Sequence, residues 1–158
     1  GGPRISALAK TGNRYAFSFP RPMIHARNYD FSFSGLKTAV LYTLRDLEKN
    51  KTPYSKNDIA ASFEDAVVDV LILKTMRAAK EFKARSIIVG GGVSANEKLR
   101  ARMSAACSAE NKPPILFFPP NNLTGDNAAM IAAIAYLHAR KNDYSDWKKL
   151  IAHATMPL

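Results

Sequence analysis

The sequence predicts an α/β fold, in which helices pack around a sheet. Two short apolar runs, residues 86–89 and the run within 113–120, have the length of buried strands. Glycines follow the first run and prolines bracket the second, so both runs end sharply. Long segments with helical periodicity precede, separate and follow them. Because strands alternate with helices along the chain, we expect layers of helix around a sheet.

The first 34 residues predict one helix and two strands. Residues 3 to about 11 have the features of a short helix, with Pro3 in its first turn and Gly12 just past its end. The segments "RYAFSFP" (14–20) and "NYDFSFS" (28–34) alternate aromatic with polar residues and are separated by a connection that contains proline. This pattern predicts two strands near a sheet edge. The sheet as a whole is expected to be mixed and flanked by helices.

Two longer helices follow. Ser34 can cap the first, whose apolar residues share one face: Leu36, Val40, Leu44 and Leu47. Ser55 and Asp58 form a capping box that opens the second, which continues to about Phe82. Its buried stripe is marked by Ile59, Phe63, Val67, Val70 and Leu71.

A triple glycine, residues 90–92, joins the first apolar run to the next helix. Ser94 and Glu97 form a second capping box, which predicts a helix to about Glu110. Glycine has no Cβ to keep a ligand away from the backbone, and the first amides of a helix are unpaired donors, so the junction suits an anion or a nucleotide. Asn96 could donate and accept hydrogen bonds toward a base, a sugar or a phosphate. The alternative is a tight strand-to-helix turn without a ligand.

A second junction, Thr124 to Asn127, follows the second apolar run and precedes an alanine-rich helix. Asp126 offers a hard anionic oxygen that suits a divalent cation, and the alternative role is that of a helix N-cap. Both junctions follow the carboxyl end of a predicted strand, where open α/β sheets bind their ligands. Beyond this helix, the tail predicts a final turn or two led by Ser145.

Composition restricts the class of protein. The 158 residues, 47% of them hydrophobic, suffice for one compact domain with a core, and the net charge of +10 favours a polyanionic partner such as nucleic acid. The single Cys107 excludes an internal disulfide framework and is expected to be a buried thiol. No run is long enough for a membrane span and no secretory leader is present, so we expect a cytoplasmic protein without a membrane partner. The first residues, Gly1-Gly2-Pro3 without Met, suggest a piece of a longer protein.

Four segments in order carry a family resemblance: "NYDFSFSGLKTAV", "DIAASFEDAVVDVL", "IIVGGGVSANEKLR" and "LTGDNAAMIAA". They resemble signatures of the TsaD family, the tRNA N6-adenosine threonylcarbamoyltransferases, formerly called O-sialoglycoprotein endopeptidases. The likeness runs from Gly1 to about Ala139. It implies an actin-like, Hsp70-like ATPase (ASKHA) fold, of which residues 1–158 would form the carboxyl-terminal lobe, with the amino-terminal lobe absent.

The resemblance also implies a set of site residues. Gly90, Gly91 and Gly92 would admit the nucleotide, and Asn96 would contact the adenylate. Gly2 matches the second glycine of a "PGGP" motif that lines the substrate site.

Asp126 would ligate a divalent metal, iron or zinc, together with two histidines of the absent lobe. His25, His138 and His153 match no metal ligand of the family.

The implied activity is tRNA modification: an acyltransferase moves the threonylcarbamoyl group from threonylcarbamoyl-adenylate, which derives from ATP, to N6 of the adenosine 3′ of the anticodon (t6A). No side-chain nucleophile is required, so Cys107, Ser34 and Ser94 are expected to be structural. The expected partners are tRNA, TsaB-like and TsaE-like proteins, the absent lobe, and a second copy in a homo-oligomer.

Candidate contacts to the RNA backbone are basic residues: Arg21, Arg27, Lys37, Lys98, Arg100 and Arg102. Two alternatives stay open. One is a nucleotide-binding lobe of an ATPase or kinase with the same fold, and the other is a non-catalytic RNA-binding module.

Overall fold

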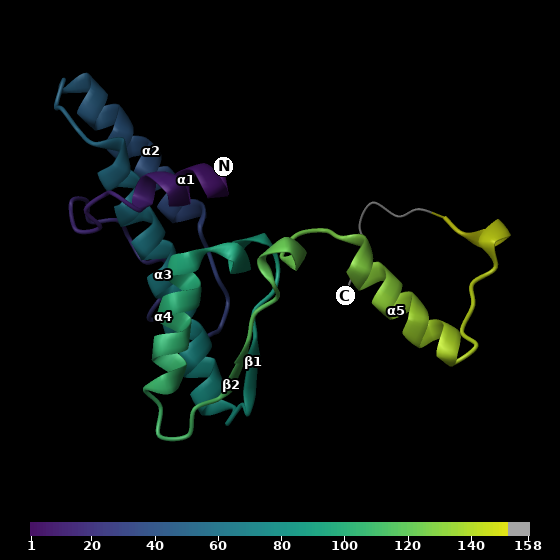
Figure 1. Cartoon of the computed structure of the whole chain (residues 1–158). Helices are drawn as coiled ribbons and strands as arrows, with labels where there is room; N and C mark the ends of the chain where they lie inside the picture. The colour runs from purple at the N-terminus through teal and green to yellow at the C-terminus, as the bar shows by residue number, and fades with distance from the viewer. Residues whose placement is uncertain (152–158) are drawn as a thin grey trace. The chain divides into compact units, whose positions relative to one another are not determined.

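The computed structural model describes residues 1–151 and divides the chain into two compact units, Gly1–Thr124 and Gly125–Leu158 (Figure 1). The first unit holds four α-helices and two strands: α1 (Gly2–Ala9), α2 (Ser34–Lys49), α3 (Lys56–Glu81), β1 (Ser86–Ile88), α4 (Glu97–Ser108) and β2 (Ile115–Phe117). Short 3₁₀ turns lie at Gly92–Ala95 and Asn121–Leu123. The second unit contains α5 (Ala128–Arg140) and a 3₁₀ turn at Trp147–Lys149, so part of the predicted tail turn is present, and the rest of the tail lies outside the described residues.

The sheet within residues 1–151 consists of β1 and β2, which run parallel with Ile87 opposite Leu116. Val89 N–H bonds to the Phe117 carbonyl, and Ile115 N–H bonds to the Arg85 carbonyl. In a parallel ladder, the backbone N–H and C=O groups of every second residue bond to the same neighbouring strand. Arg85 and Val89 bond to β2, so the N–H and C=O groups of Ser86 and Ile88 point to the edge of β1 away from β2. The expectation of two strands at these positions is confirmed, and the structure shows that they are parallel. The expectation of a mixed sheet has no counterpart in the described residues.

The two aromatic segments are not strands, which corrects the prediction for 14–20 and 28–34. Their alternation instead places neighbouring rings on one side: Phe17 and Phe19 stack at 6.1 Å, and Phe31 and Phe33 stack at 6.4 Å. The Phe17 N–H donates to Ser62 Oγ of α3, at 3.2 Å, instead of to a neighbouring strand. A side chain of α3 therefore supplies a hydrogen-bond partner for a backbone group that the sequence pattern had assigned to pairing between strands.

Basic side chains of α3 hold the connection between these segments. Lys74, fully buried, donates to the Met23 carbonyl at 3.0 Å. Arg77 donates to the carbonyls of Ala26 and Asn28, each at 2.7 Å. The connection thus lies along α3 without forming secondary structure of its own.

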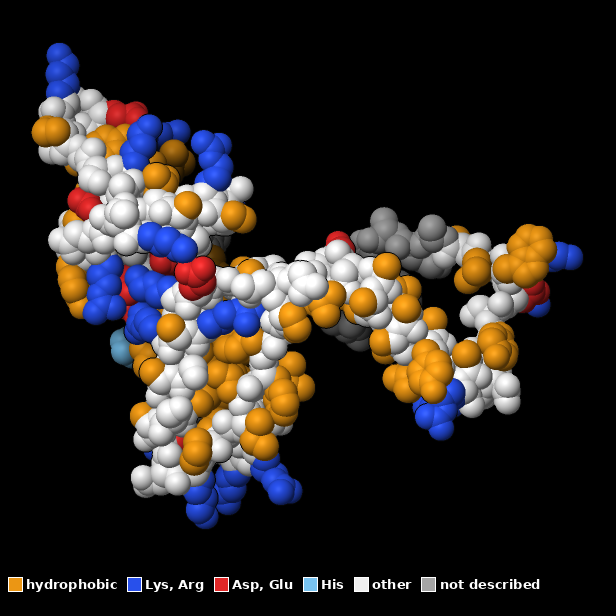
Figure 2. Space-filling model, viewed as in Figure 1, with side chains coloured by type: hydrophobic (Ala, Val, Ile, Leu, Met, Phe, Trp, Pro, Cys, Tyr) orange, Lys and Arg blue, Asp and Glu red, His pale blue; other side chains and the backbone are white. Residues whose placement is uncertain are grey.

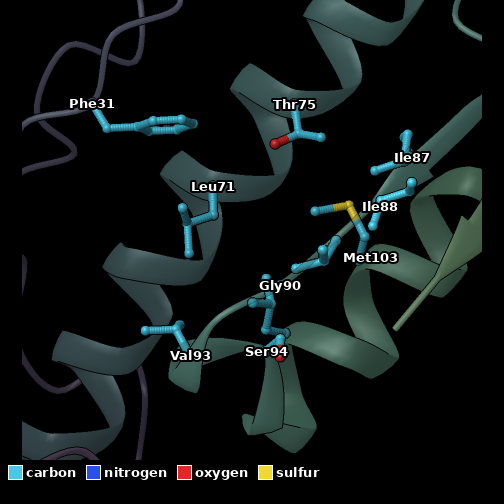
Figure 3. A pocket seen from close by; sticks show the side chains of 11 residues that line it. Phe31, Leu71, Thr75, Ile87, Ile88, Gly90, Val93, Ser94 and Met103 are labelled. Carbon is cyan, nitrogen blue, oxygen red and sulfur yellow. The ribbon is translucent and has the colours of Figure 1, made fainter. Parts of the chain in front are cut away.

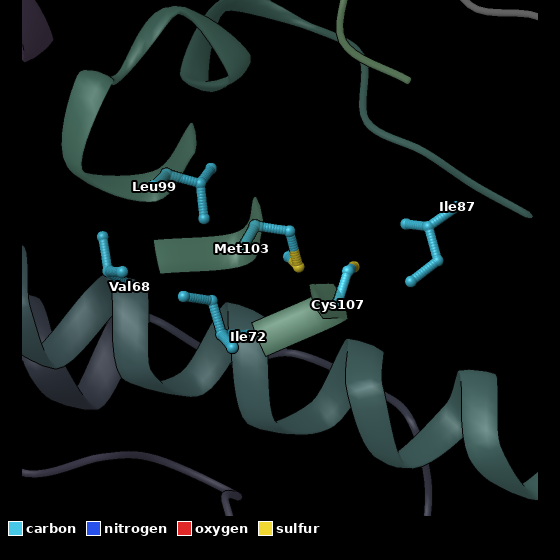
Figure 4. Close-up of a cluster of buried hydrophobic side chains, with 6 residues drawn as sticks. All are labelled: Val68, Ile72, Ile87, Leu99, Met103 and Cys107. Atoms are coloured by element: carbon cyan, nitrogen blue, oxygen red, sulfur yellow. The ribbon is translucent and has the colours of Figure 1, made fainter. Parts of the chain in front are cut away.

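Two larger hydrophobic clusters and a smaller one, formed by Ala9, Ala60 and Ala61, include residues of α3. One of the larger clusters joins α3, β1 and α4 and contains Val68, Ile72, Ile87, Leu99, Met103 and Cys107 (Figure 4). The other larger cluster contains Phe19, Leu36, Ile59 and Ala66 and holds α2 and the first aromatic segment against α3. Cys107 is buried, as the sequence predicted, and burial, with a smaller contribution from Glu110, raises the pKa of its thiol.

Helix α3 begins as predicted and α2 does not. The Ser55 hydroxyl accepts from the Asp58 N–H at 3.3 Å, whereas the Asp58 carboxylate accepts from Asn13 N–H at 2.7 Å. In α2 the N-cap is Phe33, with no side-chain cap bond, so Ser34 is already helical. The predicted Ser34 cap is wrong.

Candidate functional site at the glycine turn

The glycine turn connects β1 to α4 and leaves its backbone accessible. Gly91 has a φ of +79°, in the left-handed region that glycine adopts without strain. A Cβ added at Gly90 or Gly92 would meet no heavy atom within 4 Å. A ligand could therefore approach the main chain of this turn closely.

Ser94 closes the turn and does not cap the following helix. It is fully buried, and its hydroxyl donates to the Gly91 carbonyl at 2.6 Å. The N-cap of α4 is Asn96, whose Oδ1 accepts from the Leu99 N–H at 2.8 Å. Glu97 pairs instead with Lys10, at 2.9 Å. The predicted capping box of Ser94 and Glu97 is wrong, because the chain forms a 3₁₀ turn around Ser94 and enters the α-helix two residues later.

Asn96 ties the turn to two other helices. Its amide nitrogen donates to Ser6 Oγ of α1 at 2.9 Å and to Glu64 Oε1 of α3 at 2.6 Å. Both amide hydrogens and one lone pair of Oδ1 are thus in use, which leaves the second lone pair of Oδ1 for a ligand. The sequence predicted a ligand contact at Asn96, and the structure adds a positioning role that only long-range contacts reveal.

Helix α1 brings Gly2 to the same side as the turn. Gly2 and Ser6 are four residues apart on α1, and Lys10 follows at the same spacing, so the three share one face. Ser6 bonds to Asn96 and Lys10 pairs with Glu97. Gly2 lies one turn further along this face, with no heavy atom within 4 Å of the position of a Cβ.

An apolar groove of about 230 Å³ borders the turn (Figure 3). Gly90, Val93 and Ser94 lie at one end, and Phe31 and Leu71 form one wall. The strand residues in its lining belong to β1 and not to β2, and the other side chains include residues of α3 and α4. It contains no ionisable side chain, so it offers no charged ligand to a metal ion.

Asp126 belongs to the second unit and is exposed. The N-cap of α5 is Asn127, whose Oδ1 accepts from the Met130 N–H at 3.0 Å, so the alternative role of Asp126 as the cap is wrong. Its carboxylate makes no hydrogen bond or ion pair within residues 1–151 and is free to act as a metal ligand.

Further metal ligands are not gathered in the described part of the chain. No group of three His, Cys, Asp or Glu side chains between residues 1 and 151 could hold a metal ion. His138 Nδ1 lies 2.6 Å from Asp143 Oδ2, His25 is exposed, and His153 lies outside the described residues. The described residues therefore do not by themselves assemble a metal site around Asp126.

Basic side chains converge on two carboxylates of α3, in what we call the ion-pair hub: Asp65, Asp69, Arg14, Arg21, Lys98 and Arg102. The Asp65 side chain is 7% exposed and contacts all four cations. Burial opposes ionisation of Asp69, but hydrogen bonds from Arg102 and Arg21 outweigh it, so the pKa of this carboxyl lies below its ordinary value.

Four of the six predicted RNA contacts have partners within the fold. Arg21, Lys98 and Arg102 belong to the ion-pair hub. Arg100 donates to the carbonyls of Ser94 and Pro119 and lies over the Phe118 ring.

No helix within residues 1–151 is both long and apolar enough to cross a membrane.

Comparison with known proteins identifies relatives. The profile of the family described as "TsaD: tRNA N6-adenosine threonylcarbamoyltransferase" matches residues 1–133. Proteins named tRNA N6-adenosine threonylcarbamoyltransferase are similar to the chain: that of Thermosipho africanus is 46% identical over 146 residues, which cover 92% of this chain and 43% of the relative. Those of Enterococcus faecalis and Lactobacillus delbrueckii are 44% and 48% identical, each over 92% of this chain and 42% of the relative. The chain thus spans less than half the length of these relatives.

Proposed function

Because the chain belongs to the TsaD family of tRNA N6-adenosine threonylcarbamoyltransferases, we propose that it forms one part of such an enzyme and supplies its nucleotide-facing turn. The observation that carries the proposal is the family match over residues 1–133, which includes the glycine turn, Asn96 and Asp126. The part proposed is the carboxyl-terminal lobe of an ASKHA-type fold. The remainder of the enzyme would come from a polypeptide segment outside residues 1–158.

The glycine turn is proposed to hold threonylcarbamoyl-adenylate, the donor derived from ATP. Gly90, Gly91 and Gly92 leave the backbone open, and the φ of Gly91 supports a glycine at that position. Asn96 would fix the turn against α1 and α3 and offer its remaining Oδ1 lone pair. Gly2, one helical turn from Ser6, would line the same site.

Asp126 is proposed as one ligand of a divalent metal, iron or zinc. Its exposed carboxylate without a capping role supports this assignment. When bound, such a cation would polarise the carbamoyl carbonyl of the donor. The other ligands belong to the proposed amino-terminal lobe.

The proposed reaction is an acyl transfer. N6 of the target adenosine, 3′ of the anticodon, forms a bond to the carbamoyl carbon, the bond from that carbon to the phosphate oxygen breaks, AMP leaves, and N6 loses a proton. The residues of this chain contribute by holding and orienting the donor, which lowers the entropic part of the barrier. No nucleophile of this chain is needed, and the burial of Cys107 and Ser94 agrees with structural roles.

The proposed partners are tRNA, TsaB-like and TsaE-like proteins, the amino-terminal lobe and a second copy of the chain. A tRNA substrate makes the cytoplasm the proposed location.

Isothermal titration of the chain with ATP or AMP tests the turn. Gly92→Leu places a side chain in the open space beside the backbone, so we expect the affinity to fall at least about tenfold, or about 1.4 kcal/mol. Gly35→Leu is the matched control, because Gly35 on α2 has equally open surroundings. Asn96→Ser retains a capping hydroxyl and removes the two amide donors, so it separates positioning from capping better than alanine does.

Equal nucleotide affinities for the Gly92→Leu and Gly35→Leu variants would contradict the assignment of the turn. Phosphate transfer from ATP by the reconstituted enzyme would favour the kinase-like alternative. Binding of tRNA without any binding of nucleotide would favour the non-catalytic RNA module.

A further inference from the structure

We propose that the ion-pair hub, together with the exposed ring of Tyr15, is an RNA-binding surface: Lys98, Arg102 and Arg14 contact phosphates, and Tyr15 stacks on a base. This inference rests on the proposed function, which requires an RNA substrate. It names the part of the first unit that would hold that RNA.

The cations of the hub are concentrated around a single atom. Lys98 Nζ lies 2.9 Å from Asp65 Oδ1, and nitrogens of Arg102 and Arg14 lie 3.3 and 3.4 Å from the same oxygen. An anionic oxygen held by nitrogens from several chain segments is also how proteins hold a phosphate oxygen. The hub therefore has the chemistry of a phosphate cradle, with a carboxylate at its centre.

Positive charge exceeds negative charge in the hub. Four cationic side chains face Asp65 and Asp69, and the adjacent Glu64 carboxylate accepts from a neutral donor, so the local excess is one positive charge (4 − 3). The neighbouring carboxylate of Glu97 is already paired with Lys10. Cations held this close repel one another, so an additional anion at the surface of the hub would be attracted.

The cations differ in their availability. Arg21 uses Nε and both terminal nitrogens, toward Asp69, Asp65 and the Phe19 carbonyl, so its role is structural. Lys98 pairs with Asp65 and carries three ammonium hydrogens, and its side chain is 24% exposed. The side chains of Arg102 and Arg14 are 35% and 43% exposed. Arg102 uses both terminal nitrogens, toward Asp65 and Asp69. Arg14 donates to the Tyr15 hydroxyl as well as to Asp65. We expect the hydrogens that remain on these two guanidinium groups and on Lys98 to contact a phosphate.

Tyr15 supplies a stacking surface beside these cations. Its residue is 75% exposed, and the Arg14 guanidinium lies 4.6 Å from the ring centroid. RNA-binding proteins use aromatic rings and guanidinium planes in this way, because every base has a face that can stack. A base can stack on this ring while the adjoining phosphates contact the cations, and this combination favours RNA.

The hub also lies next to the glycine turn. Lys98 follows Asn96 by two residues on α4, and Asp65 follows Glu64 on α3, where Asn96 and Glu64 are hydrogen-bonded. Figure 2 shows Lys and Arg side chains gathered with Asp and Glu side chains where α1, α3 and α4 meet. RNA bound there would lie beside the turn that is proposed to hold the donor.

Fluorescence anisotropy with a labelled, unmodified tRNA transcript tests the surface, with the 158-residue chain and a series of NaCl concentrations. We expect Tyr15→Ala to weaken binding at least about fivefold, since one stacked base contributes about 1–3 kcal/mol. Lys98→Gln should reduce the slope of log K against log [NaCl] by about 0.7 to 0.9, as expected for one lost phosphate contact. The controls are Tyr42→Ala and Lys80→Gln, which alter exposed residues on α2 and α3 away from the hub.

A third variant should strengthen tRNA binding instead of weakening it. Asp69→Asn removes one carboxylate charge and retains an acceptor, so tRNA binding should become at least about twofold tighter. A variant that merely loosened the fold would bind more weakly, and circular dichroism of each variant monitors folding. Tighter tRNA binding by Asp69→Asn would therefore indicate electrostatic recognition, whereas weaker binding would indicate damage to the fold.

Three outcomes would overturn the inference: equal effects of Tyr15→Ala and Tyr42→Ala, an unchanged salt slope for Lys98→Gln, or displacement of tRNA by poly-glutamate as effectively as by unlabelled RNA. The last result would assign the hub to an acidic protein partner. Nucleotide binding that still depends on Gly92 would then leave the proposed function intact. Loss of that dependence, with tRNA binding as expected, would instead overturn the proposed function.

Discussion

Gly12 lies where the chain leaves α1 and touches the start of α3, and replacing it with alanine should destabilise the fold strongly. A Cβ at this position would lie 2.0 Å from the Asn57 carbonyl oxygen and 2.9 Å from the Ala61 Cβ. The lower limit of ordinary contact is 3.4 Å, so the separation from the oxygen must increase by about 1.4 Å (3.4 − 2.0). The clashing atom is helix backbone, which cannot rotate away as a side chain can.

The cost follows from the contacts that such a shift disrupts. Overpacking costs about 1–3 kcal/mol, and two hydrogen bonds join the same segments, from Asn13 N–H to Asp58 at 2.7 Å and from Asn57 to Thr11 at 2.9 Å. At about 1 kcal/mol each, these bonds bring the expected loss to roughly 3–5 kcal/mol. That is a large part of the stability of an ordinary domain, about 5–15 kcal/mol.

Urea unfolding followed by circular dichroism measures this loss. With an m-value of about 2 kcal/mol per molar, the midpoint should fall by about 2 M. Gly35→Ala on α2 is the control, because its Cβ meets nothing within 4 Å, and it should raise the stability by about 0.4–1 kcal/mol. If the two variants had midpoints that agreed within error, the packing of α1 against α3 described above would be refuted.

Three further predictions concern pH, the thiol and the sheet edge. The pKa of Asp69 is lower in the folded state than in the unfolded state, so its contribution to stability is complete above about pH 4 and is lost as the pH falls through the folded pKa. The Asp69→Asn variant should therefore lose less stability on acidification than the unmodified chain. An unchanged acid dependence would contradict the pairing of Asp69 with Arg21 and Arg102. Cys107 should react with a maleimide slowly in the folded chain and rapidly in urea, because burial raises its pKa and blocks access; equal rates would contradict its burial. The amides of Ser86 and Ile88 should exchange hydrogen rapidly in this chain and slowly in a full-length relative, where we expect a further strand to pair with β1; fast exchange in both would argue against that completion.

Local signals were sufficient to predict the long helices and the positions of the two strands, but not that the strands are parallel. The helical periodicity after Ser55 predicted α3 almost to its last residue, and the glycine run predicted a turn between β1 and α4. The N-cap of α4 was harder to predict, since Ser94 and Asn96 are both good capping residues and lie two positions apart. The choice between them depends on the 3₁₀ turn that the buried Ser94 hydroxyl stabilises through Gly91.

The aromatic segments show why alternation alone is insufficient. Alternating residues put Phe17 and Phe19 on one side in any extended chain, whether or not a neighbouring strand exists. Hydrogen-bond partners decide between a strand and a coil, and here α3 supplies them from Ser62, Lys74 and Arg77. Such partners are about 50 residues away in sequence, beyond the range of any local pattern.

The sequence by itself determined the family and the chemical nature of the glycine turn, because both depend on residue types in a fixed order over short distances. Only the tertiary structure decided how Asn96 is held between Ser6 and Glu64 and how four cations gather on Asp65. These contacts join residues separated by tens of positions, and they exist because packing of α1 and α4 against α3 brings the side chains within hydrogen-bonding distance.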